Sequence, residues 1–293
     1  MFSVNVPARK NLFPTSRLTA VVLQLYYLVL LFAGMSAGAQ ELEAMRQQFL
    51  LGNYAEVIKV AQKEVDDNGY RSDWRRLLVE SLLTVGRYGE ACTNANDGLN
   101  GYASDIGMRL LAREAALFQN DLAGANRRLV EISTLLERRP PSAQGGEELV
   151  ALGRALLLLG VEPRLVLENC FQRAEKMEPP PREAFLATGQ LALDKHDFAL
   201  AADAFRLGLK KFPDDPDLQT GLARAFETGN REEMLKAVEA ALAVNPKHVP
   251  SLLLLADHLI DGEQYDEAEK QLALVLQVNP HQPEALEIGR AHV

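Results

Sequence analysis

The stretch FLATGQLALDKHDFALAADAFRLGLKKFP, residues 185–213, decides the fold. It contains two apolar segments separated by the polar turn Lys195-His196-Asp197, with small residues such as Gly189 and Ala201 inside them. Apolar side chains recur at helical rather than alternating spacing, and Pro213 ends the second segment because proline cannot continue a helix. The stretch therefore predicts a helix, a turn and a second helix.

The same pattern recurs along the chain at a nearly fixed spacing. The closing prolines Pro179, Pro213, Pro246 and Pro280 are separated by 34, 33 and 34 residues. The turns of the first half, Gly52-Asn53-Tyr54, Gly86-Arg87-Tyr88 and Asn120-Asp121-Leu122, are also 34 residues apart. Such a period indicates a repeat array whose units cannot bury their apolar faces alone.

One frame places equivalent small or apolar residues in seven copies. These residues are Val57, Ala91, Ala125, Leu167, Ala201, Met234 and Ala268. The step from the third copy to the fourth is 42 residues, longer than the others. We expect a linker within this step.

The repeat pattern resembles the tetratricopeptide repeat family. The resemblance is clearest in copies five and seven, at Phe185, Gly189, Phe198, Ala201, Phe205 and Pro213 and at Tyr265, Ala268 and Pro280. Copies three and four depart from the family pattern, because Asn120 replaces the turn glycine and Val161-Glu162-Pro163 lengthens the turn after Gly160. The resemblance covers about residues 40–286 and implies an all-α, right-handed superhelical solenoid of antiparallel helix hairpins. It also implies a non-catalytic scaffold that binds a protein or peptide on its concave face.

The composition limits the classes of partner. The chain has 293 residues, 47% of them hydrophobic and 6% aromatic, and a formal net charge of −9. A nucleic-acid surface would require clustered Lys and Arg to neutralise phosphates, so we expect no nucleic acid as a partner.

The first 39 residues differ from the repeats. Arg9, Lys10 and Arg17 precede the apolar stretch 18–35, and Ala37-Gly38-Ala39 supplies a cleavage site. This pattern predicts a secretory signal peptide over 1–39 and an exported protein, periplasmic or extracellular. The alternative is an uncleaved membrane anchor over 18–37, because the apolar stretch approaches the ~20 residues that span a bilayer. A membrane is expected as a partner only in that case.

The remaining boundaries follow from composition. We expect repeats one to three over 40–137, a Pro/Gly-rich linker over 138–146, and repeats four to seven over 147–286. Residues 287–293 read as the translation of a DNA string that resembles a sequencing-library adapter, and we predict that they are not native. Pro283-Glu284-Ala285-Leu286 resembles the start of an eighth helix.

No nucleotide-binding loop and no His-Glu-x-x-His zinc motif occurs in the sequence. We therefore expect no catalytic residue, no metal site and no cofactor. His196 and His281 are predicted to be exposed turn residues. A metal site at His248 and His258 is less expected than a plain surface. The acids of Asp214-Asp215-Pro216-Asp217 are predicted to cap the following helix rather than to act as an acid/base pair.

Cys92 and Cys170 fall in the second helices of copies two and four. The intervening hairpin should hold their Cα atoms beyond the roughly 4.4–6.8 Å that a disulfide requires. We expect two buried free thiols.

The family pattern places candidate partner-binding residues on the groove face of each first helix. They are Arg46, Phe49, Arg76, Glu80, Glu114, Arg154, Gln190, Asp194, Phe226, Glu227, Asp257 and Asp261. The N-terminal part of this groove is mixed in charge and the C-terminal part is acidic, which favours a basic or amphipathic peptide. For any one of these residues, packing against the next hairpin is an equally good interpretation. No Asn falls at the positions where the family grips acidic peptide C-termini, so that binding mode is not supported.

The sequence thus predicts an exported, non-enzymatic repeat scaffold that binds a protein or peptide in its groove. The alternative is the N-terminal recognition module of a larger exported enzyme, a hydrolase or peptidase, whose catalytic domain would follow residue 286.

Overall fold

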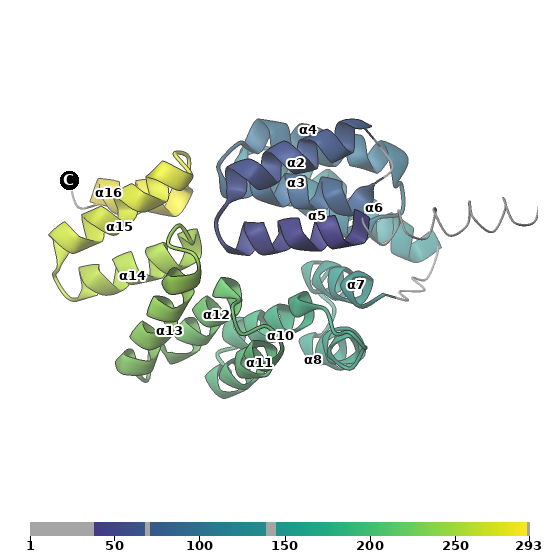
Figure 1. Ribbon diagram of the computed structural model, residues 1–293. Helices are drawn as coiled ribbons and strands as arrows, with labels where there is room; N and C mark the ends of the chain where they lie inside the picture. The colour runs from purple at the N-terminus through teal and green to yellow at the C-terminus, as the bar shows by residue number, and fades with distance from the viewer. Residues whose placement is uncertain (1–37, 68–70, 139–144, 292–293) are drawn as a thin grey trace, which may run out of the picture. The chain divides into compact units, whose positions relative to one another are not determined.

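A computed structural model describes residues 38–67, 71–138 and 145–291 (Figure 1). The chain forms two units, residues 1–44 and 45–293. Only residues 38–44 of the first unit are described, and they are helical. The predicted signal peptide or anchor thus lies almost entirely outside the described residues and stays a prediction. Among the described residues, no helix is both long and apolar enough to cross a bilayer.

The second unit is a series of helices joined by short turns. After helical residues 45–50, the helices are α2 (Tyr54–Asp67), α3 (Ser72–Thr84), α4 (Tyr88–Gly101), α5 (Ile106–Phe118), α6 (Leu122–Arg138), α7 (Gly146–Leu158), α8 (Pro163–Val166), the π-helical turn η1 (Leu167–Phe171), α9 (Gln172–Glu175), α10 (Arg182–Asp194), α11 (Phe198–Lys211), α12 (Pro216–Phe226), α13 (Arg231–Val244), α14 (Val249–Asp261), α15 (Tyr265–Val278) and α16 (Pro283–Ala291). The described residues include no β-strand. The predicted all-α solenoid of helix hairpins is confirmed.

Each hairpin pairs a first helix with a second helix. The first helices are residues 45–50, α3, α5, α7, α10, α12 and α14, and α16 follows as the eighth helix that the sequence predicted. The second helices are α2, α4, α6, the segment α8–η1–α9, α11, α13 and α15. Neighbouring helices in this order pack on one another, so the core runs from hairpin to hairpin (Figure 1).

The seven-copy frame predicts the buried side of the second helices with one error. Val57, Ala91 and Ala201 are fully buried, and the equivalent residues of copies three, six and seven are almost so. In copy four, Leu167 is only half-buried, whereas Val166 is 1% exposed. The frame is therefore wrong by one residue there, because the π-helical turn η1 adds one residue between the buried position and Phe171.

Two glycines of the first helices allow close packing, as the sequence predicted. A Cβ atom on Gly153 would lie 2.4 Å from the ring of Phe171, and one on Gly189 would lie 2.4 Å from the ring of Phe205. Both phenylalanines are buried. Any side chain at these glycines would displace the aromatic ring that fills the space between the two helices of the hairpin.

The turns of the first two hairpins contact the ends of the last two complete hairpins. Asn245 Nδ2 donates a hydrogen bond to Tyr54 Oη over 3.0 Å, and Asn279 Nδ2 donates one to Tyr88 Oη over 2.9 Å. Each pair is 191 residues apart, so the repeat period produces two equivalent rungs.

Glycine is required in both rungs. Gly52 and Gly86 have φ angles of 81° and 76°, in the left-handed region, and a Cβ atom on either would lie about 2 Å from the amide oxygen of Asn245 or Asn279. The Gly-x-Tyr turn of copies one and two therefore forms a surface that receives an asparagine side chain. The same turn position holds Asn120 and His196 with φ of 58° and 57° in copies three and five.

The predicted linker lies between α6 and α7. Helix α6 ends at Arg138 and α7 begins at Gly146, and residues 139–144 lie outside the described residues. Residues 287–291 continue α16, and 292–293 are not described. The proposed non-native origin of 287–293 stays a prediction.

Candidate functional site

The candidate site is the inner face, formed by the first helices of successive hairpins. Charged side chains at the N-terminal ends of these helices join one hairpin to another. Arg46 Nη1 lies 3.2 Å from Glu147 Oε1 in the first turn of α7, and Arg76 Nη1 lies 3.7 Å from Glu147 Oε2. Arg76 also donates to Asp105 Oδ2 over 2.7 Å. Copies one and two are therefore tied to copies three and four.

A second network joins copies five, six and seven. Arg182, at the start of α10, donates to Asp215 Oδ2 over 2.5 Å and to Asp217 Oδ2 over 2.6 Å. Asp217 Oδ1 lies 3.0 Å from His248 Nε2, and His248 Nδ1 lies 2.7 Å from Ser251 Oγ. Burial would raise the pKa of Asp217, but its hydrogen bond with His248 and the charge of Arg182 hold the pKa well below its usual range.

Asp215 combines two roles in this network. Its Oδ1 accepts hydrogen bonds from the backbone N–H groups of Asp217 and Leu218, over 3.0 and 3.1 Å, and so caps α12. The capping role predicted from the sequence is confirmed. The sequence did not indicate that the same carboxylate, 1% exposed, would also receive the Arg182 guanidinium.

Glu80 differs from the other charged residues of the inner face. It lies on α3, solvent reaches its side chain, and it makes no ion pair with the described residues. Loss of hydration among the surrounding helices, together with the charge of Glu183, raises its pKa to about 7. Arg46, Arg182 and Arg76 oppose this shift only in part. An unpaired carboxylate thus faces the two charged networks.

Four carboxylates gather at the C-terminal end of the inner face. Asp257 of α14 lies near Glu227, Glu284 and Asp261. Burial raises the pKa of Asp257, the three neighbouring carboxylates raise it further, and only Arg224 opposes them. None of the four makes an ion pair with the described residues. We call Glu227, Asp257, Asp261 and Glu284 the acidic end.

The structure places the twelve predicted groove residues in different surroundings. Arg46, Arg76 and Glu80 meet in the N-terminal part, and Glu227, Asp257 and Asp261 meet at the acidic end. Glu114 and Arg154 influence one another, since burial raises the pKa of Glu114 and Arg154 lowers it. Gln190 Nε2 donates to Asp194 Oδ1 over 2.8 Å on the exposed surface of α10.

The two aromatic candidates belong to the packing. Phe49 meets Tyr54 edge to face with ring centroids 5.4 Å apart. Phe226 is half-buried against the core residues of copies five and six, and the Arg206 guanidinium lies 5.2 Å from the centre of its ring. For these two residues the packing interpretation holds.

Sequence reasoning missed Glu147, Arg182 and Glu183, which the structure brings to the inner face. These residues lie in the first turns of α7 and α10, whereas the family frame looks for groove residues further along each first helix. The only signal in the sequence was their place directly after breaker segments, 138–146 and Pro179-Pro180-Pro181.

His248 also departs from expectation. The sequence suggested a plain surface residue, but its side chain is buried and bonded to Asp217, Ser251 and Thr220. His196 and His281 are exposed, as predicted. Among the described residues, no group of three or more His, Cys, Asp or Glu is arranged to hold a metal ion.

Both cysteines are free thiols, as predicted. Cys170 is buried, and burial raises the pKa of its thiol. Cys92 is only half-buried, so the expectation that it is fully buried was wrong.

The fold and the inner face define a helical-hairpin solenoid with a charged inner wall. Family profiles described as tetratricopeptide repeat match residues 225–288, 168–216 and 186–233. Residues 168–288 of the chain are tetratricopeptide repeats. Such repeats form a non-catalytic scaffold for protein–protein interaction.

Comparison with curated proteins found no match. Among solved structures, the Cut9–Hcn1 hetero-tetramer of the APC/C shares 13% identity over 83% of this chain, with a TM-score of 0.48. This chain spans 46% of that chain's length. A tetratricopeptide repeat protein from Parabacteroides merdae shares 14% identity over 82% of this chain and 92% of its own, with a TM-score of 0.49. YrrB, described as a TPR protein with an unusual peptide-binding site, shares 18% identity over 66% of this chain and 95% of its own, with a TM-score of 0.34.

Proposed function

We propose that the inner face binds a peptide segment of a partner protein that carries basic side chains. The observation that carries this proposal is the acidic end, where Asp257 of α14 lies near three other carboxylates, one at the C-terminal end of α12, one on α14 and one on α16, and only Arg224 opposes their effect on its pKa. Like charges held together destabilise one another, so a Lys or Arg side chain placed among them would relieve this repulsion.

Glu80 supports the same choice of ligand at the other part of the inner face. The arginines near it are engaged with Glu147, Asp105, Asp215 and Asp217. Glu80 is therefore left as a hydrogen-bond acceptor without a cation of its own. A basic side chain bound there would favour its charged form and lower its pKa.

The test uses fluorescein-labelled peptides in which Lys alternates with pairs of Leu, and matched peptides with Glu in place of Lys. Anisotropy should show binding of the basic probe that weakens as salt rises, because the attraction is electrostatic. The double variant Glu227→Gln/Asp257→Asn should lose about tenfold in affinity, as expected for two lost ion pairs of modest strength.

The control variant is Glu232→Gln/Glu239→Gln, which removes the same charge from exposed residues of α13. This control should bind the basic probe as the wild type does. Equal binding of the acidic probe, or equal loss of affinity in the control variant, would overturn the proposal.

We further propose that the protein is exported, on the evidence of Arg9, Lys10 and Arg17, the apolar stretch 18–35 and the site Ala37-Gly38-Ala39. Expression of the full chain followed by N-terminal sequencing of the mature form tests this proposal. A mature chain that begins at Gln40 is the expected result. A full-length chain recovered only from the cytosolic fraction would contradict it.

A further inference from the structure

Helix α6 packs less against the following first helix than the other second helices do. In copies one and two, the second helices α2 and α4 pack closely against the following helices α3 and α5. Helix α6 packs on α5 but makes few contacts with α7, the next first helix. The longer step between copies three and four therefore leaves one face of a second helix without its usual partner.

The solvent-facing side of α6 carries a regular stripe of side chains. Arg127, Val130, Thr134 and Arg138 follow one another at intervals of three and four residues, so they lie on one side of the helix. Val130 is 65% exposed, more than any other large apolar residue in the described part of the chain. A shallow hollow of about 360 Å³ runs along this face, lined by these residues and by Arg109, Glu131 and Leu135.

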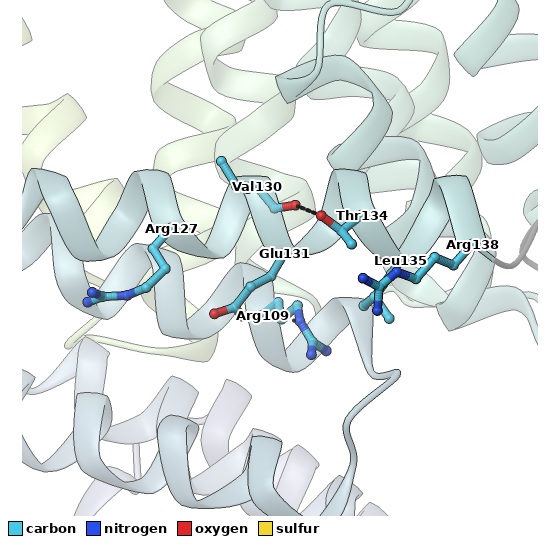
Figure 2. A pocket seen from close by; sticks show the side chains of 7 residues that line it. All are labelled: Arg109, Arg127, Val130, Glu131, Thr134, Leu135 and Arg138. Carbon is cyan, nitrogen blue, oxygen red and sulfur yellow. Dashed lines mark hydrogen bonds and ion pairs between the residues drawn. The ribbon is translucent and has the colours of Figure 1, made fainter.

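The hollow has an excess of positive charge. Arg127 and Arg138 lie near its two ends, with Arg109 and Glu131 between them (Figure 2). Neither Arg127 nor Arg138 makes an ion pair with the described residues. The single carboxylate of Glu131 is shared, because Arg128 Nη1 lies 2.8 Å and Arg109 Nε 3.4 Å from its Oε2 atom.

Arg109, which also lines the hollow, is only partly satisfied by its partners. Its side chain is almost fully buried, and its Nε atom has no well-aligned hydrogen-bond acceptor. Its guanidinium does donate to the backbone oxygens of Asp105 and Ala103. Burial lowers the pKa of Arg109, Glu131 opposes this shift, and the charge of Arg128 adds to it. The hollow thus has one carboxylate, Glu131, for its three arginines, although the protein as a whole is acidic.

We propose that this face of α6 docks an amphipathic helix of a partner protein, with one or two apolar residues between flanking carboxylates. Arg127 and Arg138 are 11 residues apart on one helix, which is about 16 Å along its axis. A partner helix with acidic residues 11 positions apart matches this span. Its apolar residues would cover Val130 and the exposed part of the Leu135 side chain. The surface belongs to a second helix and is distinct from the inner face.

The experiment uses a stapled helical peptide with Glu at positions i and i+11 and Leu at i+4 and i+7, and a matched probe with Lys in place of Glu. Anisotropy with the full chain should show saturable binding of the acidic probe only. The variant Arg127→Glu/Arg138→Glu should weaken binding at least tenfold, and Val130→Ser should weaken it less. The control variant Lys63→Glu/Lys270→Glu makes the same charge change at exposed residues of α2 and α15 and should bind as the wild type does.

Four results would overturn the proposal. The acidic probe fails to bind, or both probes bind equally, or the control variant loses affinity as the Arg127→Glu/Arg138→Glu variant does. The fourth is a change of occupant: if Arg127→Glu/Arg138→Glu dissociates a dimer in sedimentation, a second copy of the chain covers the face. Circular dichroism of each variant shows that a loss of affinity is not a loss of fold.

Discussion

Copies four and five build the same hairpin from segments of different length. In copy five, Ala201 and Phe205 are buried four residues apart in α11, and Phe205 packs on Gly189. In copy four, Val166 and Phe171 are buried five residues apart, yet Phe171 packs on Gly153 in the same way. The extra residue falls in η1, where the helix widens to a π-turn. A π-turn accommodates one inserted residue without rotating the rest of the helix.

This comparison shows which feature of the repeat is fixed. The contact between the first-helix glycine and the second-helix phenylalanine is kept, while the turn and the helix between them vary in length. The ring of the phenylalanine fits closely against the glycine backbone, so a side chain of another shape at either position would destabilise the hairpin. An added residue at the surface costs little folding free energy. The length of copy four therefore changes at exposed residues.

Deletion of one residue should give the largest difference in stability between a change in copy five and a change in copy four. Removing Asp203 would rotate Phe205 by about 100° around α11 and away from Gly189, which should cost at least about 3–5 kcal/mol, the cost of losing a buried phenylalanine. Removing Asn169 from η1 should restore four-residue spacing and change the unfolding free energy by less than about 1 kcal/mol. Urea unfolding followed by circular dichroism measures both. Equal destabilisation by the two deletions would show that η1 is not an inserted residue.

The charged residues that begin α7 and α10 give the second contrast. Asp215→Asn keeps a capping side chain but removes a buried ionic partner of Arg182, which should cost about 2–3 kcal/mol. Glu147→Gln, in a half-exposed pair with Arg46, should cost about 1 kcal/mol or less. Chemical unfolding of both variants at low and high salt tests this difference, and the Glu147→Gln effect should shrink as salt rises. A larger effect for Glu147→Gln would contradict the ranking.

The two glycines should respond alike despite the different helices above them. Gly153→Ala and Gly189→Ala each place a Cβ atom within 2.4 Å of a buried ring, and the forced shift should cost about 1–3 kcal/mol. Gly229→Ala is the control, because no atom lies within 4 Å of its added Cβ. Thermal unfolding should show lower midpoints for the first two variants and little change for the third. Tolerance at Gly153 alone would mean that copy four packs loosely.

The last contrast concerns Glu80, whose effect on stability depends on pH. The folded protein raises the pKa of Glu80 from 4.5 to about 7, so ionisation of this group opposes folding. The stability of the wild type relative to Glu80→Gln should fall as pH rises from about 4.5 to about 7 and then stay level. Thermal midpoints between pH 4 and pH 8 measure the difference. Glu239→Gln on the exposed surface of α13 is the matched control, and a wild-type stability that rises with pH relative to Glu80→Gln would refute the assignment.

The hairpins could be predicted from the sequence because their signals are local. Helical spacing, closing prolines and small residues at crossings each act within one or two turns of helix, so copy five could be read residue by residue. The error at Leu167 arose because a π-turn leaves no mark in the pattern of apolar residues when the residue it adds is polar.

The candidate site was predicted only in part for the same reason. The periodic frame found Arg46, Arg76 and three residues of the acidic end, but not Glu284. It missed Glu147 and Arg182, which lie in the first turns of their helices. These two residues join the inner face only because each forms an ion pair with a residue of another hairpin.

The sequence by itself determined the number, order and buried sides of the hairpins, because the apolar and small residues that pack each hairpin lie within that repeat. Only the tertiary structure decided which distant hairpins meet. The rungs Tyr54–Asn245 and Tyr88–Asn279 join residues 191 positions apart, and no local pattern specifies them. They depend on the sum of small rotations between successive hairpins, and that sum is a property of the whole stack.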